Sequence, residues 1–121
     1  MIKTFFIMSV IIFFCNSAKA QTAPCSQLID YVYRNGTSKD KIDSVLFTYS
    51  SWLKGVESYT IDNKIVVIAT LNKNGSTKQY IFCDVPPTIW DTYYKNRMLI
   101  LDKTLGEQFH EYIYGYKCDC Q

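Results

Sequence analysis

The spacing of apolar positions changes twice along the chain, and each spacing predicts a different kind of element. Residues 25–36 carry apolar side chains at helical spacing: Cys25, Leu28, Ile29 and Val32. Asn35-Gly36 follows, and this pair is typical of a helix end. We therefore expect a short helix here, followed by a loop over the polar residues 37–43.

From Ser44 onward, β-branched and aromatic residues predict strands. Segments 44–53 and 56–61 have this composition, and Lys54-Gly55 between them indicates a bulge or a turn. Residues 64–71 are almost continuously apolar, as in a central strand covered on both faces. Residues 77–85 are expected to return as its hairpin partner, because Asn74-Gly75 is a strong turn signal.

Helical spacing returns after Pro86-Pro87, which ends the last strand. The first of two helices has an apolar stripe of Ile89, Trp90, Tyr93 and Tyr94. The second, near 104–114, has Leu105, Phe109, Tyr112 and Ile113 on one face and Glu107, Gln108 and Glu111 on the other. The sequence therefore predicts an α+β fold: a three- to four-stranded antiparallel meander covered on one face by two C-terminal helices, plus a short N-terminal helix.

The first twenty residues have the pattern of a signal peptide. Lys3 precedes an apolar run from Thr4 to Phe14, and Ala18-Lys19-Ala20 is a small-x-small cleavage pattern. The run is shorter than the roughly 18 residues of a membrane-spanning helix. We expect cleavage after Ala20 and a secreted or periplasmic protein that is not membrane-bound after the leader is removed. Cys15 would be lost, because Phe14 before it does not suit lipoprotein acylation.

Removal of the leader changes the charge balance. Lys3 and Lys19 belong to the leader, so 13 Lys and Arg fall to eleven, which equals the 11 Asp and Glu. A neutral chain argues against nucleic-acid binding by bulk electrostatics. The nearest thing to a basic patch in sequence, Lys95, Arg97 and Lys103, is interpreted as a solvated loop.

The mature chain keeps four cysteines, Cys25, Cys83, Cys118 and Cys120, and in an exported domain an even number predicts disulfides. Only Asp119 separates Cys118 from Cys120, so a bridge between them would be strained. Each is expected to pair with a distant partner, Cys25 or Cys83, and the connectivity stays open. The alternatives are a metal site that includes His110 and a redox pair. No metal or cofactor is expected.

Several residues from Ser50 onward occur in the order of a known module. They are Ser50, Ser51, Trp52, Gly75, Tyr80, Phe82, Val85, Pro86, Gly106, Phe109 and Ile113. This order resembles the KTSC domain, found at the C-terminus of some lysyl-tRNA synthetases and as a stand-alone bacterial or phage protein. His110 departs from the family's usual Asn. The resemblance implies a compact fold with a binding role. The leader, the N-terminal helix and the cysteines are additions to the plain module, so the expected layout is leader (1–20), N-terminal helix and loop (21–43) and KTSC-like domain with a cysteine-containing tail (44–121).

The sequence offers few residues for catalysis. His110 is the only histidine, and a Cys83–His110 dyad would need a reduced thiol. Glu107 and Glu111 lie one helical turn apart, as on an ordinary solvated face. There is no phosphate-binding loop or nucleophile elbow. We therefore expect no enzymatic activity.

Aromatic residues are the most distinctive feature of the mature chain. Trp52, Trp90, Phe82 and Phe109 are assigned to the core. Tyr94, Tyr112 and Tyr114, together with His110, are candidate contact residues, because tyrosine suits recognition surfaces. The sequons at Asn35 and Asn74 are interpreted as Asn-Gly turns.

The expected function is that of a small exported binding or structural module whose partner is a protein. The alternatives are a periplasmic immunity protein or inhibitor that neutralises a toxin, and a thiol-based redox enzyme that uses Cys118, Cys120 or His110. A nucleic-acid-binding module ranks third.

Overall fold

The computed structural model describes residues 23–98 and 104–120, so the expected leader and Lys103 lie outside the described residues. Its larger elements are α1 (Cys25–Asn35), β2 (Thr37–Ile42), β3 (Leu53–Ile61), β4 (Lys64–Lys73), β5 (Ser76–Val85), α2 (Pro87–Lys95) and α3 (Leu105–Tyr112). Three 3-10 turns complete the set: η3 (Ser44–Phe47), η4 (Asn96–Met98) and η5 (Tyr114–Tyr116). The expected α+β fold is confirmed.

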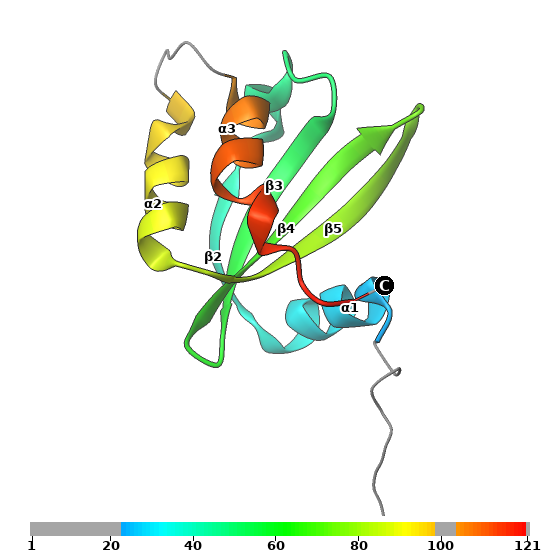
Figure 1. Ribbon diagram of the computed structural model, residues 1–121, viewed down its shortest axis with the longest axis vertical. Helices are drawn as coiled ribbons and strands as arrows, with labels where there is room; N and C mark the ends of the chain where they lie inside the picture. Colours follow the sequence, from blue (N-terminus) through cyan, green and yellow to red (C-terminus); the bar gives the residue numbers. More distant parts are fainter. Residues whose placement is uncertain (1–22, 99–103, 121) are drawn as a thin grey trace, which may run out of the picture.

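The four strands form one antiparallel sheet in the order β2-β3-β4-β5 (Figure 1). Two-residue turns join β3 to β4 and β4 to β5. Both central residues of each turn have positive φ: 52° and 63° at Asp62 and Asn63, and 53° and 84° at Asn74 and Gly75. Turns of this kind match the twist of the strands, so the Asn-rich sequence of these turns accounts for the meander.

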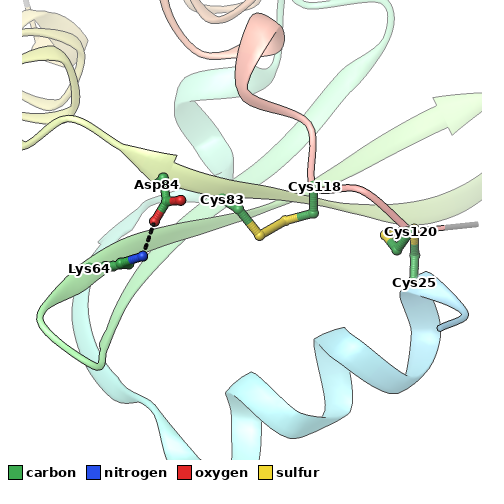
Figure 2. The surroundings of a disulfide bond; sticks show 6 residues. All are labelled: Cys25, Lys64, Cys83, Asp84, Cys118 and Cys120. Atoms are coloured by element: carbon green, nitrogen blue, oxygen red, sulfur yellow. Dashed lines mark ion pairs between the residues drawn. A yellow bond between two sulfur atoms is a disulfide. The ribbon is translucent and has the colours of Figure 1, made fainter. Parts of the chain in front are cut away.

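Each strand pairing contains one irregularity, and that of β2 with β3 lies between Ser38 and Asp40. The pairing of β3 with β4 shifts between Leu53 and Gly55, so of the two alternatives at Lys54-Gly55, a bulge or a turn, the structure has the bulge. The pairing of β4 with β5 shifts between Ile65 and Val67, opposite Asp84, whose φ is 52°. Lys64 and Asp84 form an ion pair at 3.4 Å at this point (Figure 2). The bulge opposite Asp84 carries no apolar signal and was not expected.

Two sequence predictions around Asp43 are wrong. Residues 37–42 form strand β2 rather than a loop, because they pair with the backbone of β3 while only Ile42 is buried. The segment 44–53 was expected as a strand, but residues 44–47 form η3, residues 48–52 lie outside the strands, and only Leu53 belongs to β3. The Asp43 carboxylate accepts a hydrogen bond from the Val45 N–H at 3.1 Å, and this local cap prevails over the β-branched composition.

The two faces of the sheet carry separate cores. The main core lies under α2, α3 and η3, and the second core lies under α1. Figure 1 shows α2 and α3 on one side of the sheet and α1 on the other. Residues 65–69 of β4 are buried throughout, which confirms a central strand covered on both faces.

Large rings fill the main core. Trp90, Phe82 and Phe109 are fully buried, as expected, and Tyr93 and Phe47 join them. Trp52, expected in the core, is only partly buried at its edge. Gln108, expected on the polar face of α3, is buried, because α3 contacts both α2 and η3 and more of its circumference is covered than a single-face pattern assumes.

None of the helices in the described parts of the chain has the length and apolar character needed to cross a membrane.

Candidate functional site

All four cysteines of the described residues form disulfides, Cys25 with Cys120 and Cys83 with Cys118 (Figure 2). Each of the two C-terminal cysteines has a distant partner, as expected, and the structure assigns the connectivity that the sequence left open. The tail after η5 is therefore tied to β5 by one bridge and to the start of α1 by the other. Residues of α1 and of the tail therefore meet beside β5.

These bridges determine which chemistry the cysteines can perform. Because Cys83 is bonded to Cys118, a Cys83–His110 dyad has no thiol to activate. In residues 23–98 and 104–120, no group of three or more His, Cys, Asp and Glu side chains is placed to hold a metal ion.

The expected contact residues fall into two places. Tyr94 stacks on Trp90 with ring centroids 5.8 Å apart, and the Arg97 guanidinium lies 3.7 Å from the Tyr94 ring centroid. His110 and Tyr114 stack on each other at 4.9 Å, at the end of α3. Tyr112 packs against the main core. Of the four, the structure brings only His110 and Tyr114 into direct ring contact.

Three lysines gather beside Tyr114, around the ring of Tyr80. The Nζ atoms of Lys73, Lys78 and Lys117 lie 5.2, 5.3 and 5.6 Å from the Tyr80 ring centroid. Lys117 Nζ also lies 4.6 Å from the Tyr114 centroid. We name Lys73, Lys78, Tyr80, Tyr114 and Lys117 the basic-aromatic surface.

The strands explain how the basic-aromatic surface forms. Lys78 lies opposite Leu71 and Tyr80 lies opposite Ala69, so Lys73, Lys78 and Tyr80 project on the face of the main core. Lys117 arrives from the tail, which the Cys83–Cys118 bridge holds against β5. The surface thus combines a hairpin with a segment far away in sequence.

The electrostatics of this surface are positive. A hydrogen bond with Lys73, together with the charges of Lys73, Lys78 and Lys117, lowers the pKa of Tyr80, although desolvation acts against it. The same hydrogen bond raises the pKa of Lys73. The ion pairs found within the described ranges use Arg34, Lys39 and Lys64 as cations and none of these three lysines. None of the three lysines therefore forms an ion pair with a carboxylate of those ranges.

A groove of about 580 Å³ lies next to the basic-aromatic surface, between α1, β5 and the tail. Ile29, Ile81 and the Cys25–Cys120 bridge form its apolar part, and Lys78 and Lys117 form part of its lining. The groove and the lysines thus meet at one strand.

A polar network fixes α1 over the sheet near this groove. The Glu57 carboxylate accepts hydrogen bonds from the Tyr59 hydroxyl at 2.6 Å and the Tyr33 hydroxyl at 3.1 Å. Gln79 Nε2 donates to the Tyr33 hydroxyl at 2.7 Å. Burial raises the pKa of both Tyr33 and Tyr59, so the two phenols stay neutral donors at physiological pH.

Sequence reasoning missed the three lysines. It singled out Lys95, Arg97 and Lys103, which are close in sequence, whereas the surface is built from lysines at positions 73, 78 and 117. The only available signal was the strand period, which places Lys78 and Tyr80 on one face.

Comparison with protein-family models, curated proteins and solved structures finds no match to this chain.

Proposed function

We propose that this chain is an exported, disulfide-stabilised recognition module without catalytic activity, which binds an anionic protein partner through its basic-aromatic surface. The observation that carries the proposal is the placement of three ammonium groups around Tyr80, none of which joins the ion pairs seen in the described residues. An anionic partner would relieve the mutual repulsion of these charges.

Protection of a sheet edge alone explains less of this arrangement. Lysines near a hairpin commonly keep an edge strand from pairing with other molecules, and Lys73 and Lys78 could serve that purpose. Lys117 comes from a separate segment, held in place by the Cys83–Cys118 bridge, and lies over a second ring, Tyr114. Cations held over aromatic rings by a crosslink are a preorganised surface, which lowers the entropy cost of binding.

The cysteine pairing supports export. Disulfides persist in oxidising compartments and are rare in the cytosol. Both bridges join residues far apart in sequence, with separations of 95 and 35 residues. They therefore suit the structural role expected behind a signal peptide.

A KTSC-like core is part of the proposal, supported by how several residues of the resemblance pack. Ser50 Oγ accepts a hydrogen bond from the Leu53 N–H at 3.0 Å. A Cβ added at Gly106 would lie 2.8 Å from Ser50 Oγ and 3.0 Å from Trp52 Nε1. Phe109 lies edge-on to Trp52 at 6.2 Å. One packing site thus accounts for the serine, the glycine and the two aromatic residues.

The test is differential capture of partners from the envelope fraction of the native host. The bait proteins are the wild type, a triple variant Lys73→Glu, Lys78→Glu, Lys117→Glu, and a control Lys39→Glu, Lys41→Glu, Lys95→Glu with the same net charge. We expect a partner that the wild type and the control retain and the first variant loses. Equal capture by all three baits would contradict the proposal. A single tight partner with toxin activity would identify the role as that of an immunity protein.

A further inference from the structure

Strand β5 lies at one edge of the sheet and has only part of its outer side covered. The tail pairs with it at Phe82 through Lys117, and the Cys118 N–H donates to the Ile81 carbonyl at 3.2 Å. The tail then leaves the strand, because Cys120 is bonded to Cys25 on α1. Within the described ranges, residues 76–80 have no strand on their outer side.

The backbone direction along this edge follows from the bond to the tail. In an antiparallel pair, alternate residues direct both their N–H and C=O groups to the same side. Because the Ile81 carbonyl faces outward, the backbone groups of Gln79 and Thr77 also face outward. The open edge therefore offers a row of backbone donors and acceptors.

The side chains on either side of this edge differ in character. On the face of the main core lie Lys78 and Tyr80, with Lys73 and Lys117 around them. On the face of α1 lies the groove, with Ile29, Ile81 and the Cys25–Cys120 bridge. A strand that paired here would direct alternate side chains toward cations and toward an apolar groove.

We propose that the outer edge of β5 at residues 76–80 binds an extended acidic segment of the partner protein as an added strand. This inference rests on the proposed function. Its acidic side chains face Lys73, Lys78 and Lys117, and its alternate apolar side chains enter the groove. Backbone hydrogen bonds supply affinity, and the alternation of side chains supplies specificity.

The same observations argue against other occupants. A second copy of this chain would place one set of edge lysines against the other, which is unfavourable. A nucleic acid has phosphates for the lysines, but it cannot continue the ladder of β5 or use an apolar groove of this kind. An acidic peptide satisfies the backbone groups, the cations and the groove together.

The test uses a fluorescently labelled peptide, EVETEVE, and the folded mature protein. We expect saturable binding that weakens with salt, measured by fluorescence anisotropy. The controls are a peptide of the same composition with its glutamates grouped, a KVKTKVK peptide, and a single-stranded oligonucleotide of equal charge. Absence of binding by EVETEVE at about 1 mM, or tighter binding of the oligonucleotide, overturns the proposal.

N-methylation tests the strand pairing without altering the protein. In an extended peptide, the N–H groups of the glutamates face one edge and those of the intervening residues face the other. Methylation of one set should abolish binding, and methylation of the other set should leave it unchanged. An equal effect of both sets overturns the proposed strand addition.

Charge reversal locates the bound peptide. The variant Lys78→Glu, Lys117→Glu should bind EVETEVE at least about tenfold more weakly, whereas the control Lys39→Glu, Lys41→Glu should bind it like the wild type. Thermal unfolding of each variant establishes that it is folded. If the peptide fails to bind while capture of the envelope partner still depends on the lysines, the strand addition is wrong and the proposed function stands.

Discussion

At the scale of single residues, Gly106 is a position where the packing of side chains from other elements leaves little room for a larger side chain. An added Cβ would meet Ser50 Oγ at 2.8 Å, and Ser50 is itself buried and bonded to the Leu53 N–H. Overpacking costs about 1–3 kcal/mol, and the better helix propensity of alanine offsets part of that. We expect Gly106→Ala to lower the free energy of unfolding by about 1 kcal/mol in urea titration.

Gly115→Ala is the matched control, because nothing lies within 4 Å of its added Cβ. Its unfolding free energy should stay within about 0.5 kcal/mol of the wild type. Equal changes in the unfolding free energy of the two variants would show that Ser50 and Trp52 leave room for a side chain at position 106.

Tyr80 is the residue whose ionisation reports on the basic-aromatic surface. The hydrogen bond with Lys73 and the three nearby cations lower its pKa, whereas burial raises the pKa of Tyr59 and of Tyr93. In an alkaline titration followed by phenolate absorbance, Tyr80 should ionise below the usual value of 10.0, before Tyr59 and Tyr93. Tyr80→Phe should remove this early phase.

Lys73→Met should shift the same phase to higher pH, since the phenolate loses its closest stabilising partner. Lys39→Met removes a lysine elsewhere and should leave the phase in place. An unchanged titration in Lys73→Met would contradict the assigned contact.

At the scale of elements, the sequence predicted those whose apolar pattern matches their burial. Strand β4 is continuously apolar because it is covered on both faces, and α1 shows one apolar stripe because it covers one face of the sheet. Strand β2 gave no such signal, since backbone pairing with β3 holds it while its side chains stay largely exposed. The segment of η3 was predicted as a strand, but the hydrogen bond between the Val45 N–H and the Asp43 carboxylate favours a 3-10 turn there.

The candidate site was less predictable than the fold. Of the four expected contact residues, only Tyr114 belongs to the basic-aromatic surface, and His110 stacks on it from α3. The three lysines were not identified, because their placement around Tyr80 depends on the hairpin register and on the Cys83–Cys118 bridge. A pairing between distant residues leaves no pattern in the local sequence.

Helix α3 begins with an interaction that can be tested by itself. The Thr104 side chain accepts a hydrogen bond from the Glu107 N–H at 3.1 Å, and the Glu107 carboxylate accepts one from the Thr104 N–H at 2.8 Å. This capping box satisfies two donors at the helix start. Thr104→Ala should therefore lower the free energy of unfolding by about 1 kcal/mol, and the thermal midpoint by about 4–8 °C.

Thr92→Ala makes the same chemical change on the exposed side of α2 and serves as the control. It should leave the thermal midpoint close to that of the wild type. If the thermal midpoint falls equally in both variants, the replacement of a helix threonine by alanine is itself destabilising, and the capping box of Thr104 is not the cause.

At the scale of the whole molecule, the two disulfides join the tail to α1 and to β5, and their connectivity can be established chemically. Trypsin cleaves after Lys117 and leaves Cys118 and Cys120 in one fragment, so it cannot separate the two pairings. An additional protease that cleaves before aspartate cuts between them at Asp119. Mass spectrometry should then find Cys118 linked to the fragment 79–83 and Cys120 linked to the fragment that contains Cys25. The crossed pairing, or four free thiols, would contradict the structure.

Comparison of the two bridges shows what each contributes to stability. The two bridges close loops with sequence separations of 95 and 35 residues. In the chain-entropy model, they raise the free energy of the unfolded chain by at most about 4.7 and 3.8 kcal/mol. The Cys25–Cys120 bridge also holds α1, which covers the second core. We therefore expect Cys25→Ala, Cys120→Ala to unfold at a lower urea concentration than Cys83→Ala, Cys118→Ala.

Hydrogen exchange separates the two contributions. If the Cys25–Cys120 bridge acts only on the unfolded chain, its removal should change the exchange rates of the α1 amides only as much as global stability changes. If it also holds the helix in place, the α1 amides in Cys25→Ala, Cys120→Ala should exchange by local opening, faster than those of β4, while the main core under α2 and α3 keeps its protection. We expect the second result, because α1 lies apart from the main core and buries only Ile29 and Val32 against the sheet. Uniform exchange across α1 and β4 would show that the packing of these two residues alone is enough to hold the helix.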